Sequence, residues 1–288
     1  MSERTAPREF VTLSDGEFET FSEFIETRIG LKMPVNKKKL LEARLQKRLR
    51  HHGFRTFTEY ADLLLRSADS YGEISEFIDE VTTNKTDFFR DASHFDRLAE
   101  LLKTGGARAR SGPFRVWSVA ASTGEEPYTI AMVCEEHKRL VRDFPYEVVG
   151  TDISYRALKT AVKGVYAGEL IEPIPESLRK RYLLKGTGRY EGTVRFVPTI
   201  RGRVEFYRLN LMNGDYGMKK GFDVIFCRNV LIYFDKERQE AILRRVYDLL
   251  NPGGYLFMGP TEGMLAAVLP LVKINNNLFR RPENAYAG

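Results

Sequence analysis

The first hundred residues place apolar side chains at the spacing of amphipathic helices. Ser14 and Glu17 have the spacing of a capping box, and the helix that they begin ends before Gly30. Three more helices are predicted before residue 82, and another from about Phe95 to Leu102. The apolar positions that carry the first four helices are Phe18, Phe21, Ile25, Ile29, Leu41, Leu45, Leu49, Tyr60, Leu63, Leu64, Ile74, Phe77, Ile78 and Val81.

From Phe114 onward the pattern changes to short β-favouring runs that alternate with helical segments. Strands are predicted at 115–119, 147–151, 223–227 and 255–258, and helices at about 127–141, 155–162 and 236–250. This alternation is typical of an α/β fold with a doubly wound, largely parallel sheet. The predicted organisation is therefore a helical N-terminal domain at 1–92, a linker helix and basic loop at 93–113, and an α/β domain at 114–288.

One insertion interrupts the α/β alternation. Between Gly186 and Leu209 the runs Val194–Val197 and Val204–Tyr207 alternate apolar and polar residues and are separated by glycine. They predict a small antiparallel β-subdomain at about 186–209, as a hairpin or three-stranded ribbon. An edge hairpin of the main sheet is the alternative. Such an appendage is more typical of an interaction surface than of a catalytic core.

Composition narrows the class of protein only a little. The chain has 288 residues, 43% of them hydrophobic, and its net charge of +6 does not by itself imply nucleic acid. Cys134 and Cys227 lack partners at metal-ligand spacing, so we predict neither a metal site nor a disulfide framework. The N-terminus is polar, and the most apolar run, 264–272, is too short to insert into a membrane. A cytoplasmic protein is expected.

The run from Phe114 to Tyr128 predicts a ligand-binding corner. A buried strand passes through small residues into a helix whose first turn contains Pro127, as at the cofactor end of a Rossmann-like sheet. The glycine-rich phosphate cradle is missing, and Glu125 and Glu126 lie where a pyrophosphate would need bare N–H groups. A dinucleotide is therefore disfavoured, and a cationic nucleoside is favoured.

An acidic residue ends the second predicted strand. Asp152 is at the position that hydrogen-bonds ribose hydroxyls in Rossmann-like sheets, although it could instead cap the next helix. Tyr155 and Lys159 make a Y-x-x-x-K pair used by some dehydrogenases, but here the pair follows the ribose acid directly and is interpreted as a surface pair. S-adenosylmethionine, which carries a ribose diol and a positive sulfur but no phosphate, fits this corner best.

Five segments, in order along the chain, resemble one family. They are TTNKTDFFR (82–90), RVWSVAASTGEEPY (115–128), GTDIS (150–154), GTGRYEGTVRF (186–196) and FDVIFCRNVLIYFD (222–235). With them the chain resembles the chemotaxis receptor glutamate O-methyltransferases of the CheR family. The resemblance implies a Rossmann-like class I methyltransferase sheet joined to a helical N-terminal domain and a β-subdomain. It also implies S-adenosylmethionine as cofactor and S-adenosylhomocysteine as product.

The resemblance further implies the residues of the site. Asn84, Thr86 and Arg90 would reach across the cofactor, and Glu126 and Asp152 would bind its polar groups. Asn210 and Leu211 would lie near the adenine, Arg228 and Asn229 would line the cofactor and the active-site floor, and Tyr233 would lie near the methyl group. Arg90 and Tyr233 would be the catalytic residues. Read alone, Asn84 and Thr86 could be helix-end caps and Tyr233 core packing.

The implied reaction methylates receptor glutamates, forming methyl esters. A carboxylate, with a pKa of about 4.3, needs no strong base. The N/D-P-P-Y motif of amino-methylating nucleic-acid enzymes is absent, and Cys227, in an apolar strand, is interpreted as packing rather than as a nucleophile. The alternative is a cofactor-binding signalling module without turnover, or one that acts on RNA.

Seven cations crowd the segment from Lys37 to Arg50, opposed within it only by Glu42. A solvated helix face is the default interpretation, and nucleic acid is not expected because no aromatic residues interleave with the charges. The resemblance implies instead that this basic helix docks on the acidic methylation region of a chemoreceptor's cytoplasmic domain. The β-subdomain could add a receptor tail as an extra strand.

Overall fold

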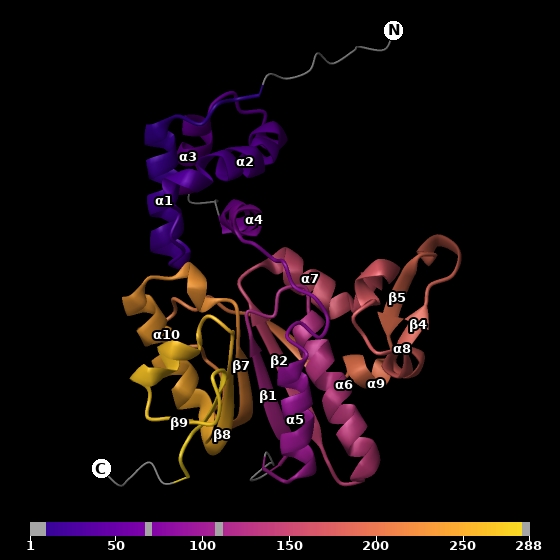
Figure 1. Cartoon of the computed structure of the whole chain (residues 1–288). Helices are drawn as coiled ribbons and strands as arrows, with labels where there is room; N and C mark the ends of the chain where they lie inside the picture. Colours follow the sequence, from indigo (N-terminus) through magenta and orange to yellow (C-terminus); the bar gives the residue numbers. More distant parts are fainter. Residues whose placement is uncertain (1–9, 67–70, 107–111, 284–288) are drawn as a thin grey trace. The chain divides into compact units, whose positions relative to one another are not determined.

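The computed structural model describes residues 10–66, 71–106 and 112–283, and the chain divides into two compact units, residues 1–83 and 84–288 (Figure 1). The polar N-terminal nine residues and most of the predicted basic loop, at 107–111, lie outside the described residues. The predicted boundary at 92 falls nine residues after the one observed. Phe88 accounts for the difference, because its ring is buried in the core of the second unit against Tyr166 and Phe196.

The first unit consists of the four predicted helices and a short 3-10 turn. They are α1 (Asp15–Ile29), η1 (Val35–Lys37), α2 (Lys38–His52), α3 (Phe57–Arg66) and α4 (Tyr71–Val81). The capping box is present, since the Ser14 hydroxyl accepts from the Glu17 N–H while the Glu17 carboxylate accepts from the Ser14 N–H. Gly53 ends α2 in the left-handed conformation. The ring of Phe21 packs on aromatic side chains of α3 and α4.

A seven-stranded sheet forms the centre of the second unit. Its order is β6 (Val204–Arg208), β2 (Tyr146–Asp152), β1 (Phe114–Val119), β7 (Phe222–Cys227), β8 (Leu250–Met258), β10 (Leu278–Arg280) and β9 (Val272–Lys273). The first five strands run parallel, β10 pairs antiparallel with β8, and β9 pairs antiparallel with β10. The doubly wound, largely parallel sheet predicted from the sequence is confirmed.

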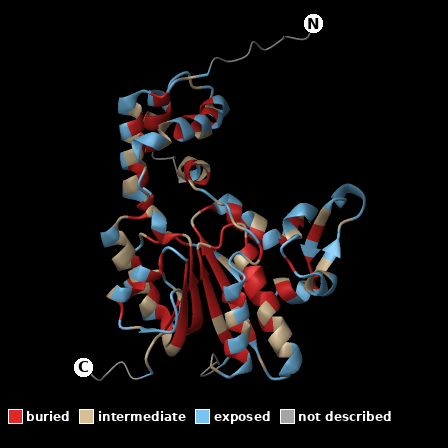
Figure 2. Ribbon diagram, in the orientation of Figure 1, coloured by how far each residue is buried: buried red, intermediate tan, exposed pale blue. Residues whose placement is uncertain are grey.

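Helices cover this sheet and bury its strands (Figure 2). They include α5 (Ser93–Lys103), α6 (Glu125–Leu140), α7 (Tyr155–Lys163) and α10 (Lys236–Leu249). In Figure 1, α5 lies beside α6, and Phe95 of α5 stacks on Phe226 of β7 with ring centroids 5.8 Å apart. The predicted linker helix is therefore an integral layer of the second unit. Helix α10 ends at Leu249, one residue before the predicted end, and β8 begins at once at Leu250, five residues before the predicted strand.

The predicted hairpin is wrong in its second strand. The run at 193–196 forms β5, which pairs antiparallel with β3 (Val165–Ala167) and β4 (Leu183–Lys185) in a separate small sheet. The run at 204–207 belongs instead to β6, which pairs in parallel with β2 at the edge of the main sheet. Both runs alternate apolar and polar residues, so pattern alone did not separate them. The short helix α9 (Pro198–Arg201) turns the chain between the two sheets.

The remaining elements are short. They are η2 (Gly168–Ile171), α8 (Glu176–Tyr182), η3 (Gly188–Tyr190), η4 (Leu231–Tyr233) and η5 (Gly263–Val268). The surface pairing predicted for Tyr155 and Lys159 is confirmed, with the ammonium 4.9 Å from the ring centroid. Within the described ranges, no helix combines the length and the apolar composition needed to cross a membrane.

Candidate active site

Backbone strain gathers at a few points of the second unit. Among the described residues, five that are not glycine have φ between 51° and 57°, a conformation that stores on the order of 1 kcal/mol or more for each residue. They are Phe89, Asp91, Ala120, Ser122 and Asn229. Two precede α5, two follow β1 and one follows β7. The strain therefore lies next to the carboxyl ends of adjacent parallel strands, where open α/β sheets bind ligands.

The corner after β1 is held by hydrogen bonds to its neighbours. The Ser122 N–H donates to Asp152 Oδ2 at 2.8 Å, and the Ser122 hydroxyl donates to the Asn84 carbonyl at 3.0 Å. Gly124 begins α6 with φ of 99°, and a Cβ there would come within 2.9 Å of Ala161 Cβ. The corner is thus closely packed beneath, and its strained backbone is tied to Asn84 and Asp152.

Asp152 ends β2 as predicted, and its side chain is nearly buried. Its Oδ1 accepts from the Ser154 N–H at 2.8 Å, while the N-cap of α7 is Ser154, whose hydroxyl accepts from Ala157. The Asn84 amide lies 3.4 Å from the same hydroxyl. Asp152 therefore orders the corner and the start of the next helix, and it lies with Asn84 at one edge of the sheet.

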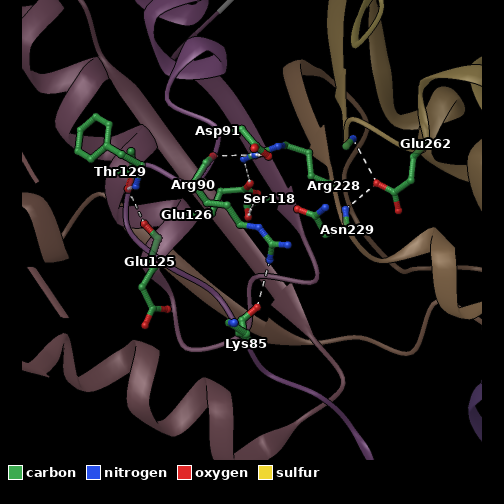
Figure 3. A network of polar contacts seen from close by, with 12 residues as sticks. Lys85, Arg90, Asp91, Ser118, Glu125, Glu126, Thr129, Arg228, Asn229 and Glu262 are labelled. Atoms are coloured by element: carbon green, nitrogen blue, oxygen red, sulfur yellow. Dashed lines mark hydrogen bonds and ion pairs between the residues drawn. The ribbon is translucent and has the colours of Figure 1, made fainter. Parts of the chain in front are cut away.

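A buried guanidinium joins three segments of the site (Figure 3). Arg228, whose side chain is 2% exposed, donates through Nη1 to Glu126 Oε2 at 2.7 Å and through Nη2 to Asp91 Oδ2 at 2.6 Å. Nη2 also donates to the Arg90 carbonyl at 2.7 Å, and Ser118 donates to Glu126 Oε1 at 2.7 Å. We call these five residues the Arg228 cluster. It fixes the 90–91 backbone to β7 and α6.

The two glutamates of the corner have different surroundings. Glu126 belongs to the Arg228 cluster, whereas the carboxylate of Glu125 lies apart from it in Figure 3 and accepts from the Thr123 hydroxyl. Burial raises the pKa of Glu125 to about 7, and its hydrogen bond with Thr123 only partly offsets this effect. The choice of Glu126 as the ligand-binding glutamate stays a prediction.

The other predicted residues lie at the same edge of the sheet or close to it. Leu209 donates its N–H to the Asp152 carbonyl at 2.9 Å, which places Asn210 and Leu211 directly after β6. Thr86 is half-buried, in the segment between Asn84 and Phe88. Asn229 is the strained residue after β7, and Tyr233 is half-buried at the end of η4. The side chain of Arg90 is exposed and donates to the Lys85 carbonyl at 3.2 Å.

Glu262 is a residue that sequence reasoning missed. Its carboxylate is fully buried and accepts from backbone N–H groups of Asn229, Val230 and Leu231. More than thirty residues separate it from this loop, so no local pattern links them. The only available signal was an acidic residue shortly after a buried strand, at the edge where the ligand corner lies.

The side chains at this edge suit a nucleoside without phosphates. Carboxylate and amide groups from Asp152, Asn84 and Asn210 match ribose hydroxyls and an ammonium group, and two glutamates begin α6 where a phosphate would need N–H groups. The Nε of Arg228 is buried and has no hydrogen-bond partner among the described residues. The doubly wound sheet and this acidic corner define the class as Rossmann-like, S-adenosylmethionine-dependent methyltransferases.

Comparison with known proteins gives the particular family. Residues 84–276 match the model of the CheR methyltransferase SAM binding domain, and residues 16–82 match that of the CheR methyltransferase all-alpha domain. The chain belongs to the CheR methyltransferase family.

Named relatives cover almost the whole chain. A chemotaxis protein methyltransferase of Klebsiella aerogenes is 42% identical over 95% of this chain and 90% of its own. One of Escherichia coli is 42% identical over 88% and 86%, and chemotaxis protein methyltransferase 2 of Pseudomonas aeruginosa is 40% identical over 87% and 88%. The solved CcbJ methyltransferase of Streptomyces caelestis aligns with 56% of this chain and 50% of its own at 20% identity. Its TM-score of 0.34 is too low to bear on the assignment.

Proposed function

We propose that this chain transfers the methyl group of S-adenosylmethionine to glutamate side chains of chemotaxis receptors, forming glutamyl methyl esters. The observation that carries the proposal is its 42% identity, over 95% of its length, to a chemotaxis protein methyltransferase. The match of residues 84–276 to a SAM binding domain supports the choice of methyl donor. The acidic corner, which has no phosphate cradle, supports it independently.

The reaction requires mainly that the glutamate oxygen and the methyl group be positioned in line. A glutamate carboxylate is ionised near neutral pH, so its oxygen can attack the methyl carbon without losing a proton first. When bound, S-adenosylmethionine supplies an activated methyl group on a positive sulfur. Aligning the attacking oxygen with that methyl group can contribute on the order of 7–11 kcal/mol toward lowering the barrier. The protein's task is to hold the two reactants in line.

We assign the residue roles by their positions at the carboxyl edge of the sheet. Asp152 would hold the ribose hydroxyls, and Asn84 and Asn229 would hold other polar groups of the cofactor. Arg90 holds the incoming carboxylate, because its guanidinium is exposed while its backbone is fixed by the Arg228 cluster. Tyr233 shapes the path of the methyl group.

We further propose that α2 supplies the docking surface for the receptor. Several cations of α2 make ion pairs or hydrogen bonds within the first unit. Arg48 is buried and pairs with Glu73, and Arg44 donates to the Val81 carbonyl at 2.7 Å. Lys39 and Lys47 pair with Glu42 and Glu80 at 3.3 and 3.2 Å, but their side chains are 83% and 61% exposed. Their exposed ammonium groups are available to meet an acidic receptor helix.

A second receptor contact is proposed at the small sheet. Its order places β5 between β3 and β4, so both outer strands are edges at which an extended receptor tail can add a strand. The reaction is assigned to the cytoplasm. The buried free thiols of Cys134 and Cys227 are compatible with a reducing compartment.

The test is transfer of radiolabelled methyl from S-adenosylmethionine to receptor-rich membranes, followed by mild base. Methyl esters release their label as methanol, whereas methylated amines and RNA bases keep it. Arg90→Ala is expected to lower the transfer rate on the order of a hundredfold. The matched variant Lys103→Ala, at an exposed position on α5, should leave the rate unchanged. Base-stable label, or label on RNA, would refute the carboxyl assignment, and cofactor binding without any transfer would indicate a signalling module.

A further inference from the structure

Glu262 is a buried carboxylate with an unusual set of partners. Its side chain is 0% exposed. Oε1 accepts from the N–H groups of Val230 at 2.9 Å, Leu231 at 2.7 Å and Ile232 at 3.4 Å. Oε2 accepts from those of Asn229 at 2.6 Å and Gly259 at 3.2 Å. All five donors are neutral backbone groups, and no salt bridge joins Glu262 to a cation within the described part of the chain.

The loop after β7 needs such an acceptor. The chain leaves β7 at Cys227, takes the left-handed conformation at Asn229 and then winds into η4, only three residues long. The first N–H groups of a helical turn have no acceptor inside it, and burying them without one is unfavourable. Glu262 supplies acceptors to four consecutive N–H groups, so the path of the loop is matched to one carboxylate.

Gly259 leaves room for the Glu262 carboxylate, and backbone hydrogen bonds fix the main chain of Glu262. A Cβ at Gly259 would lie 2.2 Å from Glu262 Oε2, so only glycine fits there without displacing the side chain. The Glu262 N–H donates to the Gly259 carbonyl, and its carbonyl accepts from Leu265, both at 2.9 Å. Glu262 therefore connects the end of β8 rigidly to the loop after β7 (Figure 3).

The same loop carries three of the predicted site residues, Arg228, Asn229 and Tyr233. Asn229 keeps an unfavourable φ of 56° that neighbouring contacts must enforce, and its N–H makes the shortest of the five bonds to Glu262. We propose that Glu262 is a positioning residue for methyl transfer, whose carboxylate fixes the loop from Arg228 to Tyr233 so that Asn229 and Tyr233 face the reacting groups. This inference rests on the proposed function.

The isosteric change Glu262→Gln tests the proposal. An amide has one oxygen and one NH₂ group, and the NH₂ group would face N–H donors that it cannot satisfy. We expect kcat at saturating cofactor and receptor to fall on the order of tenfold to a hundredfold, while the receptor KM stays within about twofold. An unchanged kcat in the folded variant would overturn the proposal.

A matched control separates positioning from stability. Asp223 is a nearly buried carboxylate on β7, the strand that leads into this loop, and it accepts from the Arg115 N–H at 2.9 Å and the Asn251 amide at 2.8 Å. Asp223→Asn should lower stability without lowering kcat. If both variants lose the same fraction of kcat, Glu262 serves stability alone and the proposal fails.

Two further measurements keep the proposal testable if the glutamine variant does not fold. Amide hydrogen exchange in the unaltered protein should be slow at Asn229, Val230 and Leu231, and fast exchange there would contradict the proposal. Gly259→Ala, which displaces the carboxylate, should reproduce the loss of kcat. If the unaltered protein methylates no receptor, the proposed function fails by itself. In that case two results would still support the role of Glu262 in fixing the loop. They are slow exchange at these amides in the unaltered protein and weaker S-adenosylmethionine binding by Glu262→Gln.

Discussion

At the scale of single residues, the fold changes the ionisation of groups near the site. Glu125 is 4% exposed and its pKa is raised to about 7, mainly because burial disfavours the charged form. Its usual pKa is 4.5. Between these two values the folded protein binds a proton that the unfolded chain has lost, so ionisation of Glu125 opposes folding as the pH rises.

Replacing Glu125 by glutamine should therefore stabilise the protein at pH 8, by on the order of 1–3 kcal/mol of unfolding free energy. The gain should shrink as the pH falls through 7 and vanish below 4.5, where the carboxyl group is protonated in both states. Urea unfolding of both proteins across this range measures it. Glu136→Gln on the same helix is the control. Hydrogen bonds from Tyr182 and Arg181 outweigh its burial and lower the pKa of Glu136, so that change should destabilise at neutral pH. A pH-independent gain for Glu125→Gln would contradict the prediction.

Residues whose roles follow from local order were accessible to sequence reasoning, and those defined by distant contacts were not. Asp152 ends a strand that pattern predicts, so its place at the sheet edge could be predicted. The partners of Arg228 come from segments more than a hundred positions away, and Glu262 meets its loop across about thirty residues. The apolar periods of 2 residues in strands and 3.6 residues in helices carry no information about such distant pairings.

At the scale of elements, the same limit explains the error over β6. The runs at 193–196 and 204–207 both alternate apolar and polar residues, and pairing them with each other needs the shortest connection. Tertiary contacts decide otherwise. The Phe206 ring lies so close to Gly150 of β2 that a Cβ there would come within 2.8 Å of it, and it meets Tyr128 of α6 at 5.8 Å between centroids. Those contacts give β6 a place in the large core.

The Arg228 cluster makes the segment before α5 part of the same core. Arg228→Met should lower the unfolding free energy by about 3–5 kcal/mol, because it leaves the mostly covered carboxylate of Glu126, whose side chain is 15% exposed, without its cation. The double variant Arg228→Met, Glu126→Gln should recover part of that loss, since no uncompensated charge then remains. Arg97→Met, which removes an ion pair whose two side chains are 33% and 57% exposed, should change stability by less than about 1 kcal/mol. Denaturant midpoints measure all three, and a single Arg228 variant as stable as the unaltered protein would contradict the prediction.

At the scale of the whole molecule, the sequence revealed the basic segment but not how its charges are used. Glu42 is the only acid inside it, yet Asp15, Glu73 and Glu80 pair with its cations from other helices. The count of seven cations against one acid therefore overstates the free positive field of this segment. Only tertiary structure shows which lysines point outward.

The salt dependence of the receptor KM should therefore come from only a few charged side chains of α2. Lys39→Glu with Lys47→Glu should raise the receptor KM several-fold at low ionic strength, and the difference should shrink when about 0.5 M salt screens the charges. Because neither lysine lies in the second unit, kcat should be unaffected. Lys219→Glu with Lys220→Glu, at two exposed positions of the second unit, serves as the control for net charge. Methylation rates over a salt series decide the matter, and equal effects from both variants would mean that α2 is not the docking surface.

The small sheet has a consequence for how this protein could diversify. It lies within the crossover from β2 to β6, after α7. Its base is closed, because the Phe196 N–H donates to the Gly164 carbonyl at 3.1 Å. Phe196 and Tyr166 anchor it to the core beside Phe88. Because the two ends of this insertion lie side by side, the small sheet can be exchanged between homologues as a unit if the rings of Phe196 and Tyr166 are kept. Where the small sheet binds the receptor as proposed above, partner choice can then change without any change to the residues proposed to bind the cofactor.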